Sequence, residues 1–508
     1  MTARFSRRDF LKVAGTLPLS ASVAPLLRGS RPPRAAGSPQ NVLVVVFDAF
    51  SAYHVSLLGY ARPTTPNMAR LAERAIVYHN HYAGGNYTTP GTASLLTGAL
   101  PWTHRAFHLN GKVAEDFVGK NIFAAFPNHH RMAYSHNPVV NILLGQFAGH
   151  IDEYVPLSSL MLTSDRVVQG LFPQDDDISD VAWIRAAKRE EFGYSYSLLF
   201  SHLYQWYIDN KIASVADEYP RGIPRIRGDN YFILADAIDW LKQQVGKLPE
   251  PYLGYVHLLP PHAPYAPEKK YYRTFVGDGY VPPIKPHNLF APSLPEQELV
   301  RKRAEYDEFV SNVDQEFGRL VDALEAAGRL ENTWLVLTSD HGELFERGFR
   351  GHGTPLLYQG VMRVPLMIFE PGRTKRLDVH DPTDATDILP TLARLAGGGT
   401  TEWSEGRLLP PFSDAAPDPD RSLFVVQGID TNVDQPVTKA TLSMVKGDHK
   451  LINYFGYPEL NGGELLELYN VKEDPEELED LATADKPKAD RLLAELKAKL
   501  AQMNQPYL

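Results

Sequence analysis

Runs of consecutive apolar residues recur along the chain, and several of them end on polar side chains. The first reads Asn-Val-Leu-Val-Val-Val-Phe-Asp at 41–48. A β-branched run without polar alternation is typical of a strand buried on both faces of a parallel sheet. Similar runs at 252–257, 333–340 and 364–369 predict further strands.

Apolar residues spaced three or four positions apart predict helices between these strands. The helices are expected at 67–74, at 93–96 with a stop at Gly98, around 309–324 with an end at Gly328, and at 486–501. Strands that alternate with helices favour an α/β fold with a mostly parallel central sheet flanked by helices.

The chain divides into segments of different character. Residues 1–36 are basic and then mildly apolar, residues 41–400 carry the alternating pattern, and residues 421–508 predict a smaller C-terminal α+β subdomain with short strands at 423–426 and 442–445. An irregular stretch at about 150–250 interrupts the pattern. Its aromatic residues, which include Trp206, have a spacing more often found in a helix core than in a ligand site.

The N-terminus reads Ser-Arg-Arg-Asp-Phe-Leu-Lys at 6–12, ahead of an apolar stretch at 13–27. This order is that of a twin-arginine export signal, and the alternative is a basic tail without structure. Gly15, Pro18 and Pro25 break the apolar stretch, which is too short for a stable transmembrane anchor. We therefore expect a periplasmic, cell-surface or secreted protein.

Composition narrows the possible chemistry. The formal net charge of -10 argues against a nucleic-acid partner, because such proteins usually present a basic face to phosphates. The chain has no cysteine, which excludes disulfides, thiolate metal ligands and cysteine nucleophiles.

Four polar residues stand at the ends of three predicted strands: Asp48, His257, and Asp340 with His341. Ligands of open α/β sheets bind beyond the carboxyl ends of the strands, where these side chains converge. Carboxylates with an imidazole suit one divalent ion of Mn, Mg, Ca or Zn. Taken singly, each residue is equally explained as a helix cap or part of a solvated turn.

A second polar motif, Thr-Thr-Pro-Gly-Thr-Ala-Ser-Leu-Leu-Thr-Gly at 88–98, leads into a short helix. A helix N-terminus offers free amides and a positive dipole end to an anion. The hydroxyl of Thr88 is a poor nucleophile unless a neighbouring cation lowers its pKa. The alternative role of these hydroxyls is helix N-capping.

Taken together and in order, the motifs resemble the sulfatase family, within the alkaline-phosphatase-like superfamily. Besides the 41–48 strand and the 88–98 motif, they are Thr-Pro-Asn at 65–67, Pro-His-Ala-Pro at 261–264, Ser-Asp-His-Gly-Glu at 339–343, Arg-Val-Pro-Leu at 363–366, Asp-Ile-Leu-Pro-Thr-Leu at 387–392, Glu-Leu-Tyr-Asn at 467–470 and Glu-Asp-Pro at 473–475. The resemblance implies an alkaline-phosphatase-like fold and a metal-dependent hydrolase of sulfate or phosphate esters.

The resemblance also implies roles for individual residues. Thr88 falls where the family has its nucleophile, and Asp48, Asp340 and His341 fall on metal ligands, with the Thr88 oxygen facing the same ion. His262 and His352 fall on positions that contact the anion or the leaving group; many sulfatases have a lysine at the latter.

His257 is a weaker candidate, either supporting the metal ligands or binding substrate. It ends a predicted strand, as Asp48 does.

Three departures from the family pattern modify this expectation. Threonine replaces the Cys or Ser that becomes formylglycine at position 88, Thr92 replaces an arginine, and Ala49 replaces a second aspartate. A threonine nucleophile is similar to that of phosphoglycerol and phosphoethanolamine transferases, so a transferase is one alternative and a non-catalytic binding homologue is another. The expected substrate is a small-molecule, glycan or lipid ester. Neither the leaving group nor the oligomeric state follows from the sequence.

Overall fold

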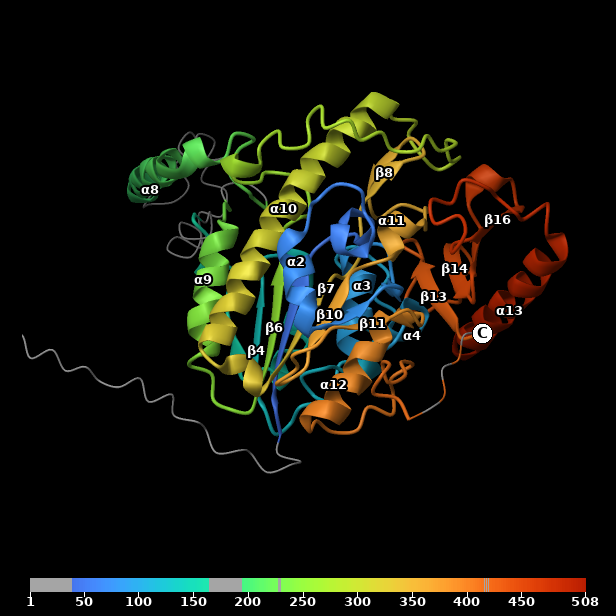
Figure 1. The fold of residues 1–508 in the computed structure, drawn as a ribbon, viewed down its shortest axis with the longest axis horizontal. Helices are drawn as coiled ribbons and strands as arrows, with labels where there is room; N and C mark the ends of the chain where they lie inside the picture. The colour runs from blue at the N-terminus through green and yellow to red at the C-terminus, as the bar shows by residue number, and fades with distance from the viewer. Residues whose placement is uncertain (1–38, 164–193, 227–229, 415, 417, 419) are drawn as a thin grey trace, which may run out of the picture. The chain divides into compact units, whose positions relative to one another are not determined.

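A central sheet forms the middle of the fold (Figure 1). The computed structural model describes residues 39–163, 194–226, 230–414, 416, 418 and 420–508. The eight strands of the sheet lie in the order β11-β2-β10-β7-β1-β6-β4-β5. Their bounds are β1 Asn41–Phe47, β2 Ile76–Tyr78, β4 His130–Ser135, β5 Glu153–Tyr154, β6 Tyr252–Leu258, β7 Thr333–Thr338, β10 Leu366–Phe369 and β11 Leu377–Val379.

The sheet is mostly parallel, as predicted. β1 lies between β6 and β7 and pairs in parallel with both, so that Val46 faces His257 on one side and Thr338 on the other. β10 is the exception and runs antiparallel to β7 and β2. The segment between β7 and β10 holds only the hairpin β8 Leu344–Glu346 and β9 Phe349–Gly351 and the one-turn helix α11 Gln359–Met362, so it lacks the long helix of a parallel crossover.

Alternate side chains of β1 point into two separate cores, one on each face of the sheet. Leu43 and Val45 pack under α2, α9 and α10, whereas Val42 and Val44 pack under α3, α5 and α12. The two layers of helices are visible on either side of the sheet in Figure 1. Their bounds are α2 Pro66–Leu71, α3 Thr88–Thr97, α5 Pro138–Gln146, α9 Leu234–Val245, α10 Glu296–Ala326 and α12 Ile388–Ala396.

The long helix α10 extends further toward its N-terminus than its apolar pattern indicated. The reason is that its first half buries charged side chains in pairs rather than apolar ones. Asp307 is fully buried and accepts hydrogen bonds from Nη1 of Arg62 at 2.8 Å and from the Tyr60 hydroxyl at 2.7 Å. Paired buried charges are invisible to a hydrophobic pattern because each charge depends on a partner far away in sequence.

A second sheet lies near the C-terminus and is antiparallel throughout, in the order β13-β14-β15-β16. The expected strands at 423–426 and 442–445 are confirmed as β13 and β14, whereas β15 and β16 were not foreseen. The bounds are β13 Ser422–Gln427, β14 Ala440–Lys446, β15 His449–Phe455, β16 Glu464–Asn470 and α13 Lys486–Asn504. α13 covers this sheet with Ala489, Leu492 and Leu496.

Buried charges join the C-terminal sheet to the segment between β7 and β10. Glu477 accepts a hydrogen bond from the backbone N–H of Gln359 at 2.8 Å and pairs with Lys450 of β15, and its carbonyl accepts from Arg347. The C-terminal sheet therefore helps to hold the 347–359 loop in place.

The stretch at about 150–250 contains α8 Tyr194–Val215. The expectation of a helix core is wrong for part of its aromatic residues, since Trp206 is 67% and Tyr207 45% exposed. Residues 164–193, like the predicted export signal at 1–36, lie outside the described residues. Within the described ranges, no helix combines the length and apolar character that a membrane crossing requires.

Candidate active site

The ends of β1, β6 and β7 bring four predicted site residues together. Asp48 follows β1, His257 lies at the end of β6, and Asp340 and His341 follow β7. All four are buried, at 0–1% exposure. Nε2 of His257 lies 3.2 Å from Oδ2 of Asp48, and Nε2 of His341 lies 3.5 Å from Oδ1 of Asp48 and 3.7 Å from Oδ2 of Asp340.

Helix α3 brings Thr88 to the same place. The expected stop at the left-handed Gly98 is confirmed, but the helix begins at Thr88 rather than near residue 93, so the motif expected as a polar turn is itself the first part of the helix. Oγ1 of Thr88 lies 3.4 Å from Nε2 of His341. A Cβ at Gly91 would lie 2.1 Å from the carbonyl oxygen of Asp340, so only glycine lets the helix approach the end of β7 this closely.

The position where the family has an arginine holds Thr92, and its Oγ1 donates to Oδ2 of Asp340 at 3.3 Å. Ala49, in place of the second aspartate, has φ of 58°, which is unusual for a residue other than glycine. Its N–H donates to Oδ1 of Asp340 at 3.3 Å. At both of these positions the chain still contacts Asp340, through the hydroxyl of Thr92 and the backbone amide of Ala49 rather than through charged side chains.

The carboxylates and imidazoles of this cluster shift one another's pKa values. Burial opposes ionisation of Asp48, but its hydrogen bonds with His257 and His341 hold the carboxyl pKa well below its usual range. Burial and the nearby Asp48 raise the pKa of Asp340. Burial opposes a charge on His341, but Asp340 and Asp48 outweigh this and raise its pKa to about 9. Among the described residues, the two buried carboxylates therefore have His257 and His341 as their ion-pair partners.

The donor set fits a divalent ion. Oδ1 of Asp48 is buried, and Nε2 of His341, at 3.5 Å, is the group that faces it. Donors sharing one ion through bonds of about 2.0–2.2 Å lie about 3–4 Å apart, as the carboxylate and imidazole atoms here do. Nδ1 of His341 donates to the carbonyl of Gly342 at 2.8 Å, which leaves Nε2 free to bind a metal.

His352 and His262 lie beside the cluster and nearer the solvent. The ring centroids of His352 and His341 are 4.3 Å apart, and those of His352 and His262 are 4.8 Å apart. Nδ1 of His352 donates to Oε1 of Glu343 at 2.9 Å. Burial lowers the pKa of His352, although Glu343 opposes this shift.

Sequence reasoning missed Asn137. It follows β4, and its Nδ2 donates to Oδ2 of Asp48 at 2.5 Å. The sequence feature that predicted Asp48, a polar residue just beyond a parallel strand, would also have predicted Asn137. β4 was not recognised because it begins His-Arg and lies near the sheet edge, where a continuous apolar run is not needed.

Sequence reasoning also assigned no role to Glu343, although the residue is part of the 339–343 motif. Burial opposes its ionisation, but His352, His262 and His341 together outweigh this and hold the pKa of the carboxyl below its usual value. Its other oxygen accepts from the hydroxyl of Tyr265 at 3.1 Å. Glu343 is thus placed to orient His352.

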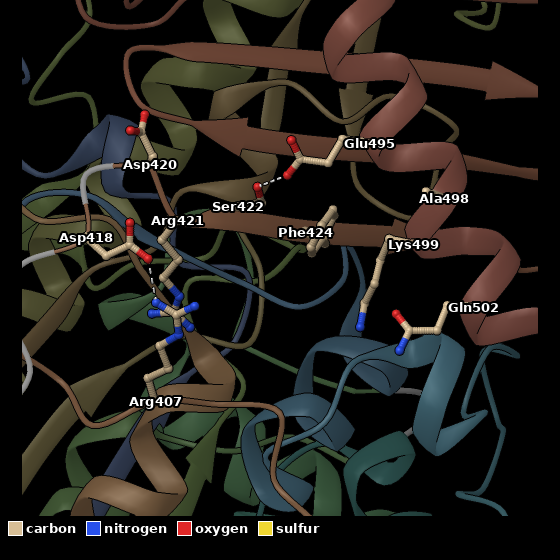
Figure 2. Close-up of a pocket in the computed structure, with 10 residues that line it drawn as sticks. All are labelled: Arg407, Asp418, Asp420, Arg421, Ser422, Phe424, Glu495, Ala498, Lys499 and Gln502. Atoms are coloured by element: carbon tan, nitrogen blue, oxygen red, sulfur yellow. Dashed lines mark hydrogen bonds and ion pairs between the residues drawn. The ribbon is translucent and has the colours of Figure 1, made fainter.

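A hollow lies away from this cluster, between α13 and β13, as Figure 2 shows. Several of its charged side chains have partners inside or just outside the hollow. Asp418 accepts from Arg407 at 2.8 Å, Arg421 donates to Asp387 at 2.7 Å, and Glu495 accepts from Ser422 and, at 2.8 Å, from Lys446. None of the predicted site residues lines it, and we assign it no part in the chemistry.

The family is decided by comparison with known proteins. A model of the sulfatase family matches residues 40–128 and 180–398. The chain belongs to the sulfatase family. A model of the C-terminal region of N-sulphoglucosamine sulphohydrolase also matches residues 349–506. The resemblance drawn from the motifs is confirmed, and the chain is a sulfatase-family hydrolase of sulfuric or phosphoric ester bonds.

Individual sulfatase-family relatives are distant in sequence but similar over most of their length. The multifunctional alkaline phosphatase superfamily protein PehA of Trinickia caryophylli is 23% identical, over 87% of this chain and 91% of its own. The choline-sulfatase of Rhizobium meliloti is 24% identical, over 68% of this chain and 66% of its own. The structure of a phosphonate monoester hydrolase of Agrobacterium radiobacter shares the fold with a TM-score of 0.63 at 19% identity, over 92% of this chain and 96% of that one.

Proposed function

We propose that this sulfatase-family protein is a metal-dependent hydrolase of phosphodiesters or phosphonate monoesters, with Thr88 as nucleophile. The main support for this proposal is that Oγ1 of Thr88, at the start of α3, lies 3.4 Å from Nε2 of His341, beside two buried carboxylates. Asp48, Asp340, His341 and Thr88 would hold the ion. When bound, such an ion supplies Lewis acidity and lowers the pKa of a coordinated hydroxyl.

The residues of the chain then account for the reaction. Oγ1 of Thr88 attacks phosphorus in line and the P–O bond to the leaving alcohol breaks, while the amides at the start of α3 face the charge that develops on the phosphoryl oxygens. Nδ1 of His262 donates to the carbonyl of Ala263 at 2.6 Å, and Nδ1 of His352 donates to Glu343. In both rings Nε2 is left to contact the ester and exchange a proton with the leaving or attacking oxygen.

Threonine favours phosphoryl over sulfuryl transfer. A phosphothreonine intermediate can be released by a second in-line attack of water at phosphorus. The aldehyde hydrate through which formylglycine releases sulfate has no counterpart on a threonine side chain. The similarity to PehA, named as a multifunctional alkaline phosphatase superfamily protein, is consistent with this choice.

The test is turnover by metal-stripped protein of nitrophenyl phosphodiester, phosphonate monoester, phosphate monoester and sulfate, with Mn²⁺, Mg²⁺, Ca²⁺ or Zn²⁺ added back. We expect phosphodiester or phosphonate to exceed sulfate by at least about 10²-fold in kcat/KM. Sulfate as best substrate would contradict the proposal, and a phosphoryl group transferred to an added alcohol in place of water would identify a transferase. Absence of turnover on every ester would favour a binding homologue.

We also propose that the protein is exported by the twin-arginine route, on the strength of Arg7 and Arg8 ahead of an apolar stretch. Replacing both by lysine is expected to retain the full-length precursor in the cytoplasm, whereas the parent protein is recovered outside it in a processed form. Cell fractionation with an antibody against the folded domain measures the difference. Equal export of the variant would contradict the route.

A further inference from the structure

We propose that His257 is itself a ligand of the ion and takes the place of the family's second aspartate. This inference rests on the metal site of the proposed function. The aspartate's position is Ala49, which has no donor side chain. His257 comes instead from β6, on the other side of Asp48 from β7.

The position of the imidazole supports a ligand role. Nε2 of His257 faces the gap between the carboxylates, 3.2 Å from Oδ2 of Asp48 and 3.8 Å from Oδ2 of Asp340. One donor atom from each of these three residues lies within 4.8 Å of the others. Oδ2 of Asp48 already accepts a hydrogen bond from Asn137, so it does not depend on His257 for a partner.

Tyr255 fixes the ring from the other side. Tyr255 and His257 are two positions apart on β6 and therefore on the same face, and the tyrosine hydroxyl lies 2.9 Å from Nδ1. With the proton on Nδ1, the ring donates to the tyrosine oxygen and presents the Nε2 lone pair to the ion. With the proton on Nε2, the ring donates to Asp48 and receives a hydrogen bond from Tyr255. The ion selects the first arrangement.

The exchange of an aspartate for a histidine changes the charge of the site. Two carboxylates and a divalent ion sum to zero when both imidazoles are neutral, whereas a third carboxylate would leave a net negative charge. The ligands are almost completely buried, where an uncompensated charge is costly. Two imidazoles also favour Mn²⁺, Fe²⁺ or Zn²⁺ over the oxygen-preferring Ca²⁺ and Mg²⁺.

Pulsed electron paramagnetic resonance of the Mn²⁺-loaded, full-length protein tests this directly, because it counts imidazole nitrogens on the ion. We expect two in the parent protein and one in His257→Gln, with Mn²⁺ and Zn²⁺ affinity lowered at least about tenfold and Ca²⁺ affinity changed less. His136→Gln is the control: this histidine is also buried, its ring nitrogens have no hydrogen-bond partner among the described residues, and it follows the adjacent strand β4. It should keep two nitrogens.

Two further variants keep the test informative if His257→Gln does not fold. Tyr255→Phe should lower Mn²⁺ affinity about tenfold while keeping two nitrogens, as expected of a positioning residue. His257→Asp should shift preference toward Ca²⁺. If the parent protein shows one imidazole nitrogen on the ion and His257→Gln shows the same, His257 is not a ligand, although the metal site itself is retained. No ion bound at Asp48 and Asp340 would instead refute the proposed function.

Discussion

Thr88→Ala is expected to lose at least about 10³-fold in kcat on the best ester, with little change in the thermal unfolding midpoint. The hydroxyl would be the atom that forms the covalent intermediate, and removal of a nucleophile is among the largest single-residue effects in hydrolases. The side chain is small and lies at the first position of α3, so its loss should not disturb the fold. Steady-state kinetics and a melting curve measure the two effects.

The neighbouring Thr89→Ala is the matched control. Oγ1 of Thr89 donates to the carbonyl of Leu109 at 2.5 Å, so it has a structural partner away from the ion. Activity should stay within about tenfold of the parent, and Thr88→Ser should remain active because it keeps a hydroxyl. Quench-flow with mass spectrometry should find the adduct on residue 88. If Thr88→Ala kept more than a tenth of the parent activity, Thr88 would not be the nucleophile.

Removal of the ion is expected to abolish turnover and to lower Tm by at least a few degrees. An ion that binds only the folded chain stabilises it by about 2.7 kcal/mol at 100 times its Kd. Without it, the buried Asp48 and Asp340 have only the neighbouring imidazoles of His257 and His341 as ion-pair partners among the described residues. Differential scanning calorimetry of chelated and reloaded protein, with elemental analysis of both, makes the measurement.

Two variants separate ion binding from general effects of the chelator. Asp340→Ala should neither bind the ion nor respond to chelation. Asp322→Ala should behave as the parent, since Asp322 is half-exposed on α10 and pairs with Arg70. A protein that keeps full activity after its metal content falls below a tenth of an equivalent would contradict metal dependence.

The central sheet could be predicted because β1, β6 and β7 are buried on both faces. A strand buried on both faces needs consecutive apolar residues, which are visible in the sequence. The same reasoning missed β4, β15 and β16. β4 lies close to the sheet edge, and β15 places Lys450 at 0% exposure opposite Glu477. A buried ion pair between distant residues breaks the hydrophobic pattern, and only the fold shows that it is satisfied.

The site was partly predictable for a different reason. Asp48, Asp340 and His341 stand at strand ends, where the topology of a parallel sheet brings them together whatever the details of packing. The role we propose for His257 depends on which way an imidazole turns, and the Tyr255 hydroxyl beside its Nδ1 becomes known only from the fold. Glu343 and Asn137 act through other side chains, so their importance appears only once distances are known.

The depth of the ligands bears on when the ion enters. The four residues at the strand ends are essentially inaccessible, whereas His262 and His352 are partly exposed, so exchange of the ion proposed above would require the surrounding segments to open locally. Substrate can come and go on the histidine side many times between such openings. The chain would therefore carry whichever ion was available where it folded, and the metal supply of that compartment, rather than that of the assay buffer, would set the activity of a fresh preparation.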